Sequence, residues 1–372
     1  MRGRARFASL SLAVLGVGAF LRAEESGTTL DSEIRRASRE APLSLQFQGR
    51  HSVDFADWQK KFSGRLKALL GPTDPPTAWT TAGAAPVELP ECWRWEYRLE
   101  AKGFPPLPLY LLVPKGMKPG EKRPAVLCVH GHGLFGPEPV VGRIDLPGVT
   151  AAIRAANYDY GLAFVKRGYV VAAPCLIPFG QRSEAGKDPA SDPCAVALVR
   201  LQALGRLPIS ENLRDLRWSL SFLQSRAEVA GDLLGCAGLS YGGRMTMLVT
   251  AVDDRIRVAA VSGALNLLQE RILGAYSCGS QIIPGLLQIG DFSDIGCLIA
   301  PRSCVWEIGS EDQLIRQPWD GMFRGSLERA YLASGHPESL HFDHFQGGHQ
   351  WHGTVAYQVF DAILRPPTDP IP

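Results

Sequence analysis

Residues 233–243 read Leu-Leu-Gly-Cys-Ala-Gly-Leu-Ser-Tyr-Gly-Gly. The first five predict a buried strand, and the residues from Gly243 to Val252 predict a helix. Between them, Gly238, Ser240 and Gly242 form the pattern G-x-S-x-G, in which small residues allow a sharp turn and leave the serine side chain exposed. A purely structural glycine turn is the alternative, but a strand before the motif and a helix after it favour a nucleophile. We therefore expect Ser240 to be a nucleophile.

Further short apolar runs alternate with helical segments on both sides of this motif. The runs are Ala125–Val129, Tyr169–Ala173, Val258–Val261, Cys304–Ile308 and Leu340–Phe345. Ser210–Gln224 is one of the helical segments, with its leucines on a single stripe. Strands that are apolar on both faces and separated by helices indicate a parallel sheet with helices on both faces.

A pair of antiparallel strands is expected before this sheet. Residues 93–99 alternate aromatic or apolar side chains with charged ones, which is typical of a half-exposed strand. Residues 108–113 form a second strand, and the short segment between them predicts a hairpin. Two antiparallel strands that lead into a mostly parallel central sheet are the layout of the α/β-hydrolase fold. We expect that fold here, class α/β, with an N-terminal helical extension.

The N-terminus of the chain carries the pattern of a secretory signal peptide. Of the 372 residues, the first six include three arginines, and Phe7–Leu21 is apolar or small throughout. We expect cleavage after Ala23 and export to the periplasm or the extracellular space, with an uncleaved anchor as the alternative. The formal net charge of +2 becomes slightly negative once the arginines of this segment are removed. Such a surface gives no electrostatic reason to expect nucleic acid or an anionic membrane as a partner.

The chain is expected to contain three regions. Residues 1–23 are the signal peptide, residues 24–90 a helical extension, and residues 91–372 the α/β-hydrolase catalytic domain. Helices are predicted in the extension at Leu30–Arg39 and at Phe55–Leu70, the second with an apolar face.

Eight cysteines in an exported chain suggest disulfides. Three of them lie in the predicted strands and are expected to be small buried residues: Cys128, Cys236 and Cys304. Among the remaining five, Cys175 with Cys194, or Cys278 with Cys297, are the pairs we consider. The sequence contains no C-x-x-C motif, so a zinc ribbon has no support.

An acid and a histidine are expected after Ser240, because the triad of this fold follows the chain order serine, acid, histidine. Asp312 lies just beyond a predicted strand, at the sheet edge where Ser240 is expected. We expect Asp312 to orient the base. Three other acids are alternatives: Glu311, Asp291 and Asp294. The last two lie farther away along the chain, and helix capping or solvation is the other role that we consider for them.

The base is expected to be His349, with His352 as the second candidate. His349 follows the last predicted strand and two glycines that allow the loop to turn back toward Ser240. The same region contains the pairs His341-x-x-His344 and His349-x-x-His352, which suggest a metal site as an alternative. Zinc hydrolases, however, usually present a helical H-E-x-x-H or a matched set of cysteines. We therefore expect no metal and no other cofactor.

The turn His130-Gly131-His132-Gly133 follows the first strand of the parallel sheet. This is where the fold places part of its oxyanion hole, the set of backbone amides that stabilises a developing negative oxygen. We expect the amides of His132 and Tyr241 to be the donors, with Gly131 and Gly133 supporting the turn. His130 is expected to make local hydrogen bonds.

From about Cys92 to Leu364 the chain resembles serine esterases of the dienelactone-hydrolase and acetyl xylan esterase group. The resemblance rests on Pro124–Gly133 (PAVLCVHGHG), Gly238–Gly243 (GLSYGG), Gly309–Asp312 and Gly347–His349. A partial match, Phe179-Gly180-Gln181-Arg182, has Phe179 where the acetyl xylan esterases have arginine, and it makes Gln181 a candidate supporting residue. Dienelactone hydrolases use a cysteine nucleophile, from which Ser240 departs.

The resemblance implies an acyl esterase, and a deacetylase of carbohydrate-type or small esters is the function we expect. A serine peptidase of the prolyl-oligopeptidase type and a non-catalytic binding protein are the alternatives. Two long connections, Leu134–Asn157 and Ser262–Gly290, are expected to shape the substrate pockets. In or beside them, Tyr158, Tyr160 and Tyr276 are candidates for stacking on a sugar, with ordinary packing as the alternative.

Overall fold

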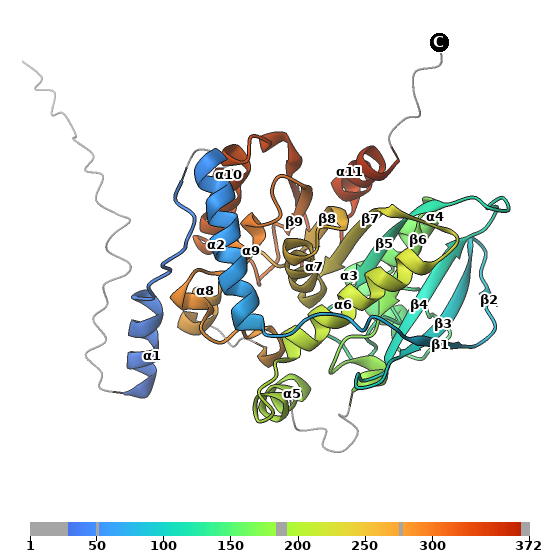
Figure 1. Ribbon diagram of the computed structural model, residues 1–372, viewed down its shortest axis with the longest axis horizontal. Helices are drawn as coiled ribbons and strands as arrows, with labels where there is room; N and C mark the ends of the chain where they lie inside the picture. Colours follow the sequence, from blue (N-terminus) through green and yellow to red (C-terminus); the bar gives the residue numbers. More distant parts are fainter. Residues whose placement is uncertain (1–28, 50–51, 184–191, 275–277, 366–372) are drawn as a thin grey trace, which may run out of the picture.

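The structure is a computed structural model that describes residues 29–49, 52–183, 192–274 and 278–365 (Figure 1). The predicted signal peptide and Tyr276 lie outside these ranges. Within them the chain forms a ten-stranded sheet with helices on both faces.

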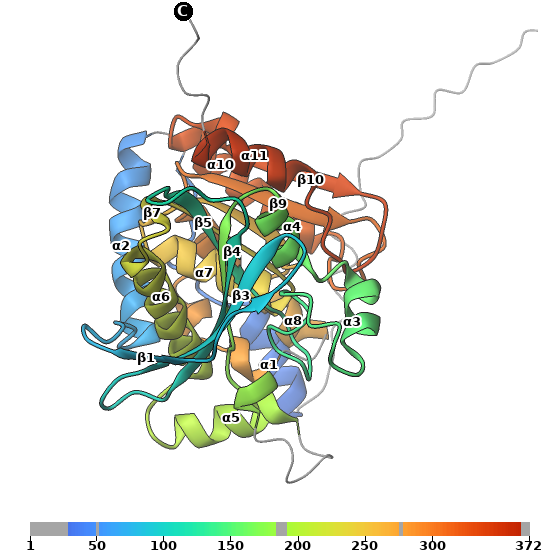
Figure 2. The same ribbon diagram turned by 90° about the vertical axis from the view of Figure 1, so that its right-hand side faces the viewer.

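The sheet is mostly parallel, with an antiparallel portion at one side (Figure 2). Its strands are β1 (Thr80–Gly83), β2 (Val87–Glu88), β3 (Cys92–Glu100), β4 (Leu107–Pro114), β5 (Arg123–Val129), β6 (Val170–Pro174), β7 (Val229–Leu239), β8 (Ile256–Ser262), β9 (Ser303–Gly309) and β10 (Leu340–Phe345). Their order is β1-β3-β4-β6-β5-β7-β8-β9-β10, and β2 also pairs with β3. Every pairing from β6 to β10 is parallel, whereas those of β1, β2, β3 and β4 are antiparallel. The predicted hairpin and parallel sheet are confirmed.

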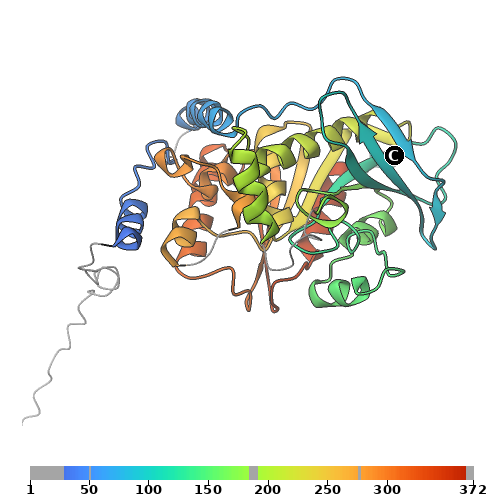
Figure 3. The same cartoon turned by 90° about the horizontal axis from the view of Figure 1, so that it is seen from below.

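Helices cover both faces of the sheet (Figure 3). They are α1 (Leu30–Arg39), α2 (Ser52–Leu70), α3 (Val149–Ala156), α4 (Tyr160–Lys166), α5 (Pro193–Gln202), α6 (Pro208–Ser225), α7 (Tyr241–Val252), α8 (Leu268–Gly274), α9 (Phe292–Cys297), α10 (Trp319–Ala333) and α11 (Thr354–Leu364). Four short 3₁₀ helices are η1 (Gly180–Arg182), η2 (Gly279–Gln281), η3 (Leu286–Gln288) and η4 (Pro337–Ser339). Helices α6 and α7 pack on one face, and α4 and α11 on the other. Among the described residues, no helix combines the length and the apolar character needed to cross a bilayer.

Strand β5 shows why the central strands are apolar at every position. Ala125, Leu127 and Val129 belong to the core on the α6 and α7 side, whereas Val126 and Cys128 belong to the core on the opposite side. Successive side chains of a strand point to opposite faces, so a sheet covered twice needs an apolar residue at each position.

Strand β3 departs from the predicted alternation. Arg94 is only 5% exposed, whereas the neighbouring Trp93 and Trp95 remain partly exposed. The guanidinium carbon of Arg94 lies 6.0 Å from the centroid of the Tyr110 ring, a cation–π contact that helps to offset burial of the charge. The charged positions of this strand therefore do not all face solvent.

The N-terminal segment contributes to the main core. Helix α2 lies against α10 (Figure 1) and buries its apolar face in the same cluster as the sheet. The buried residues are Phe55, Trp58, Phe62, Leu66 and Leu70. The indole nitrogen of Trp58 donates to the carbonyl of Leu45 at 2.6 Å, which fixes the entry to the helix. Residues 24–90 also contain strands β1 and β2, so this segment is not helical throughout.

All eight cysteines are buried and free of disulfides. The three expected in strands are found there: Cys128 in β5, Cys236 in β7 and Cys304 in β9. Neither of the two pairs considered, Cys175–Cys194 and Cys278–Cys297, forms a disulfide. The thiol of Cys175 instead donates to the carbonyl four residues along at 3.2 Å, and that of Cys297 to the carbonyl of Ser326 at 3.3 Å.

Candidate active site

Ser240 forms a sharp turn between β7 and α7. Strand β7 ends at Leu239 and α7 begins at Tyr241, so one residue reverses the chain. Its φ of 64° and ψ of −123° form a combination that residues with a side chain rarely adopt. The amide of Ser240 donates to the carbonyl of Ser262 at 2.9 Å, and its carbonyl accepts from the amide of Arg244 at 3.0 Å. A strained serine held at the end of a strand is the geometry of a nucleophile elbow.

The two motif glycines make room for this turn. A Cβ atom at Gly242 would lie 1.9 Å from the carbonyl oxygen of Val129, and one at Gly238 would lie 2.5 Å from the backbone of Gly242. These neighbours are backbone atoms of β5 and of the turn itself. They cannot move without disturbing the sheet, so packing requires a residue without a side chain at both positions.

Asp312 and His349 form a hydrogen-bonded pair. His349 Nδ1 lies 2.7 Å from Asp312 Oδ2, and the Asp312 side chain is 1% exposed. The second carboxylate oxygen of Asp312 accepts from the amide of Leu314 at 2.9 Å. The alternative acid Glu311 is exposed. The structure thus brings together the acid and the histidine selected from the sequence.

His349 keeps one ring nitrogen free and lines a cavity together with Ser240. A carboxylate only accepts hydrogen bonds, so Nδ1 of His349 carries the hydrogen and Nε2 keeps its lone pair. The buried Nε2 atom has no hydrogen-bond partner. Ser240 and His349 line one cavity of about 260 Å³ together with His132 and Tyr158. An unpartnered acceptor in a cavity that holds the serine is suited to accept a proton there.

Gly263 sets the position of the imidazole ring. Its φ is +61°, and a Cβ atom there would lie 2.7 Å from His349 Cε1. The ring therefore packs directly on the backbone just after β8, next to the strand that carries Ser240.

The turn after β5 is fixed by side chains on both of its sides. His130 is fully buried, its Nε2 accepts from the amide of Leu176 at 2.9 Å, and its Nδ1 donates to the carbonyl of Gly131 at 2.7 Å. Burial lowers the pKa of His130 to about 4, so the ring is neutral at pH 7. The amide of Gly131 donates to the hydroxyl of Tyr158 at 2.5 Å. The local role expected for His130 is confirmed.

His132 and Tyr241 lie side by side next to Ser240. Their ring centroids are 5.1 Å apart, and His132 lines both cavities that contain Ser240. The Tyr241 hydroxyl accepts from Asn212 at 2.8 Å and donates to the carbonyl of Ser280 at 3.2 Å. These two hydrogen bonds anchor Tyr241, the first residue of α7. The backbone amides of His132 and Tyr241 remain our candidates for oxyanion donors.

The two remaining acids considered from the sequence act as caps. Asp291 accepts from the amides of Leu268 at 2.6 Å and of Phe292 at 2.6 Å. Asp294 accepts from the amides of Phe47 at 3.1 Å and of Asp291 at 2.8 Å. Both carboxylates are therefore used in holding α8, α9 and the N-terminal segment.

His352 belongs to a second, separate pair. Its Nδ1 lies 2.8 Å from Asp343 Oδ2, and its ring stacks on Phe345 at 4.5 Å. It does not line the cavities that contain Ser240.

The buried carboxylate of Glu307 accepts from the amides of His352 at 3.1 Å and of Gly353 at 2.6 Å. The sequence analysis missed Glu307, which holds the segment just after His349.

Gln181 lies away from the serine. Its side-chain amide is 3.4 Å from Glu138 Oε1, and it lines a cavity that does not contain Ser240. The neighbouring Arg182 instead forms a buried ion pair with Asp215 at 2.6 Å. The partial motif therefore fixes the loop after β6, and direct contact of Gln181 with the serine is not seen.

A second cavity of about 260 Å³ opens on the other side of Ser240 and contains two arginines. Arg244 is 1% exposed, donates to the Asn266 side chain at 2.6 Å and lies over the Phe292 ring at 3.7 Å. Burial lowers the pKa of Arg244 to about 9. Arg271 is the other arginine. The sequence analysis missed Arg244, although its place on α7, one helical turn after Ser240, is a signal that it faces the same site.

Described residues of both long connections line these cavities. Residues of the first connection, among them Phe135 and Ala156, contribute to the cavity with His349. Gly263, Asn266 and Gln281 of the second connection contribute to the cavity with Arg244. Of the tyrosines proposed to contact a sugar, Tyr158 lines the first cavity, whereas Tyr160 is buried and donates to the carbonyl of Val129 at 2.6 Å. Tyr160 is therefore a packing residue.

One group of side chains in the described part of the chain could hold a metal ion: His132, Cys194 and Cys278. The four histidines considered from the sequence, His341, His344, His349 and His352, do not form such a group. Contact with Cys278 and His132 lowers the pKa of the Cys194 thiol, while Cys194 raises that of Cys278. The sequence analysis missed this cluster because its members come from three distant segments without a spacing motif.

The chain is similar in sequence to a known bacterial protein. No family model matches the chain. YtaP from Bacillus subtilis (strain 168), provisionally named a hydrolase, is 26% identical to this chain over 264 residues. The match covers 68% of this chain and 80% of YtaP.

Solved structures of carbohydrate esterases share the architecture. A Bacteroides fragilis protein provisionally named an acetyl xylan esterase has a TM-score of 0.71 at 18% identity and covers 87% of this chain and 84% of its own. A glucuronoyl esterase from Teredinibacter turnerae has a TM-score of 0.60 at 16% identity. The match covers 88% of this chain and 89% of the esterase chain. Together with the strand order and the serine turn, these similarities show that the chain has the α/β-hydrolase fold.

Proposed function

We propose that this protein is an exported serine carboxylic-ester hydrolase that acts through an acyl-enzyme on Ser240. The observation that carries the proposal is the Asp312–His349 pair, because His349 has a free Nε2 and lines a cavity together with Ser240. Serine is a weak nucleophile until an oriented base takes its proton, and these three residues supply those roles. Their order along the chain is that of this fold.

The reaction follows from these positions. His349 Nε2 removes the proton of the Ser240 hydroxyl as its oxygen attacks the ester carbonyl. The negative oxygen of the tetrahedral intermediate accepts hydrogen bonds from the amides of His132 and Tyr241. His349 then donates its proton to the leaving alcohol. Water, activated by the same histidine, hydrolyses the acyl-serine and releases the acid.

Carbohydrate esters are the substrate class we favour. The similar structures are named as acetyl xylan and glucuronoyl esterases. In this chain the second cavity beside Ser240 is lined by Arg244, Asn266, Arg271 and Gln281, whose polar groups can hydrogen-bond sugar hydroxyls. The other cavity is lined mainly by apolar residues. An ester that joins a sugar to a small acyl group fits a site with apolar walls and a few hydrogen-bonding side chains.

The proposed location is outside the cytoplasm. Residues 1–23 carry the signal-peptide pattern, and we propose residues 24–90 as an N-terminal extension and residues 91–372 as the catalytic domain. N-terminal sequencing of the protein recovered from the periplasm or medium checks the cleavage after Ala23. Recovery of the intact chain from the cytoplasm alone would contradict export.

Replacement of Ser240 tests the catalytic proposal. We expect Ser240→Ala to lower the turnover of 4-nitrophenyl acetate on the order of 10⁴-fold or more and to abolish labelling by a fluorophosphonate probe. Ser334→Ala, at the end of α10, is the matched control and should keep both signals. Cleavage of proline-site peptides without cleavage of acetyl esters would instead support a peptidase. A panel of acetylated xylan fragments and glucuronoyl esters then ranks the substrates.

A further inference from the structure

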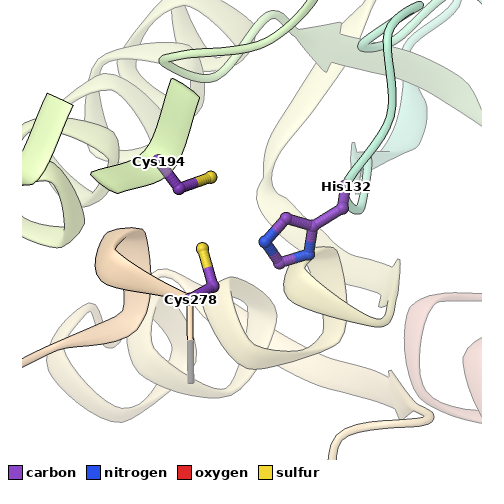
Figure 4. A group of neighbouring side chains, drawn as sticks. All are labelled: His132, Cys194 and Cys278. Atoms are coloured by element: carbon purple, nitrogen blue, oxygen red, sulfur yellow. The ribbon is translucent and has the colours of Figure 1, made fainter. Parts of the chain in front are cut away.

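His132, Cys194 and Cys278 converge from three separate segments (Figure 4). His132 follows β5, Cys194 lies in the first turn of α5, and Cys278 precedes η2. One ligand atom of each residue lies within 4.8 Å of the other two. Segments that are 62 and 84 residues apart along the chain thus present one nitrogen and two sulfurs to a common point.

The two sulfurs are held in place by tight packing. A Cβ atom at Gly279 would lie 2.9 Å from the carbonyl oxygen of Cys194, so α5 and η2 touch through their backbones. The amide of Ser280 donates to Cys278 Sγ at 3.3 Å, and the amide of Cys194 donates to Asp192 at 2.9 Å. These contacts fix the backbone positions of both cysteines where α5 meets η2.

The cluster is closed on one side and open on the other. Cys194 is 3% exposed and Cys278 is 8% exposed, whereas His132 is exposed. His132 and Cys278 both line the second cavity beside Ser240, the one that contains Arg244. An ion can therefore reach the two buried sulfurs from that cavity, and a water molecule or another small ligand can complete its coordination from the same side.

We propose that His132, Cys194 and Cys278 form a binding site for a thiophilic divalent cation, with Zn²⁺ as the representative ion. One imidazole and two cysteine sulfurs are a ligand set used by zinc, which accepts a fourth ligand from solvent. Hard cations such as Mg²⁺ prefer oxygen ligands and are not expected to bind here. Binding releases the thiol protons, so affinity increases with pH.

The site adds a metal to a region where the proposed ester hydrolysis needs none. The cluster shares only His132 with the proposed oxyanion turn, through its side chain rather than its backbone amide. A bound cation would tie that turn to α5 and η2. The metal-binding inference itself does not depend on the esterase proposal, because its test measures binding and not turnover.

The test is a titration of the reduced protein with Co²⁺, followed by displacement with Zn²⁺. We expect one ion per chain and a thiolate-to-cobalt charge-transfer band that Zn²⁺ removes and Mg²⁺ does not. Cys194→Ser and Cys278→Ser should each weaken binding by more than about tenfold, since even a lost outer partner of a ligand costs 10–100-fold. Cys297→Ser removes a buried thiol outside the cluster and should leave binding unchanged.

Three results would overturn the proposal. The first is the absence of the charge-transfer band in the reduced wild-type chain, and the second is equal binding by the Cys194→Ser, Cys278→Ser and wild-type proteins. The third is a Cys194–Cys278 disulfide, seen by peptide mass mapping of protein prepared without reductant, together with no metal uptake after reduction. Circular dichroism and the melting temperature of each metal-free variant establish that a loss of binding does not come from unfolding.

Discussion

His349 Nδ1 lies 2.7 Å from Asp312 Oδ2, although the two residues follow different strands. Strands β9 and β10 are parallel neighbours whose last residues, Gly309 and Phe345, face each other. Both loops therefore leave the sheet at the same edge. The amide of Glu311 donates to the carbonyl of Gly347 at 2.9 Å and joins the two loops just before the acid and the base meet.

Asp312→Asn should lower kcat for 4-nitrophenyl acetate on the order of 10³- to 10⁴-fold with little change in melting temperature. The asparagine amide can donate to Nδ1, which would favour the tautomer with its hydrogen on Nε2 and remove the base. Steady-state kinetics measures the loss. Glu311→Gln changes the exposed neighbouring acid and should retain nearly full activity. If the Glu311 variant loses the activity and the Asp312 variant keeps it, the assignment of the acid is wrong.

The sequence identified this pair because its signals are local. Ser240, Asp312 and His349 each come after a predicted strand, and parallel strands place such residues at one edge of a sheet. The chain order then assigns their roles. The glycines that frame Ser240 are also visible in the sequence, because the turn cannot form with a side chain at those positions.

Contacts between distant segments were not predictable in this way. Arg94 is buried because Tyr110 and the second layer of helices cover a face that the alternation assigns to solvent. Cys194 and Cys278 meet because α5 packs on η2, and no periodicity or spacing encodes that contact. Cysteine pairing could not be read from the sequence for the same reason, since it depends on which connecting segments touch.

Gly242→Ala should destabilise the protein and remove most of its activity. The new methyl group would lie 1.9 Å from the Val129 carbonyl oxygen, so β5 or α7 must move. We expect a loss of about 1–3 kcal/mol in the free energy of unfolding, the usual cost of overpacking. Chemical denaturation measures it. Gly64→Ala, in the middle of α2 with open space around the new methyl group, should be neutral or slightly stabilising.

Glu307 should make stability depend on pH. Burial raises the pKa of Glu307 to about 6, above the value near 4.5 expected in the unfolded chain. The folded state favours the protonated form of Glu307. The resulting contribution to stability is fully present below about pH 4.5 and is lost as the pH rises through about 6. The difference between the folded and unfolded pKa values corresponds to about 2 kcal/mol of unfolding free energy.

Glu307→Gln isolates this effect, because the variant cannot ionise at that position. The unfolding free energy of each protein is measured by denaturation at several pH values. The value for the wild type, relative to that of the variant, should decrease between about pH 4.5 and pH 6.5. A difference that stays constant across this range would contradict the assignment. Asp254→Asn changes a fully exposed carboxylate and serves as the control, with no comparable trend expected.

Tyr158→Phe should lower kcat roughly tenfold while leaving KM nearly unchanged. The Tyr158 hydroxyl accepts from the amide of Gly131 at 2.5 Å, next to the amide of His132 that we propose as an oxyanion donor. Without that hydroxyl the buried amide loses its partner, at a cost of about 1–3 kcal/mol, and the turn is less firmly held. Stabilisation of the transition state should decrease more than substrate binding, because the oxyanion exists only in the transition state and intermediate.

Tyr331→Phe is the matched control for this variant. It removes a buried hydroxyl that donates to the carbonyl of Arg302 at 2.8 Å, on α10 and outside the cavities that contain Ser240. This variant should lose stability without losing kcat at a temperature where it is fully folded. An equal fall of kcat in both variants would show that Tyr158 acts only through stability. A fall confined to Tyr158→Phe assigns it as a positioning residue for the turn that carries His132.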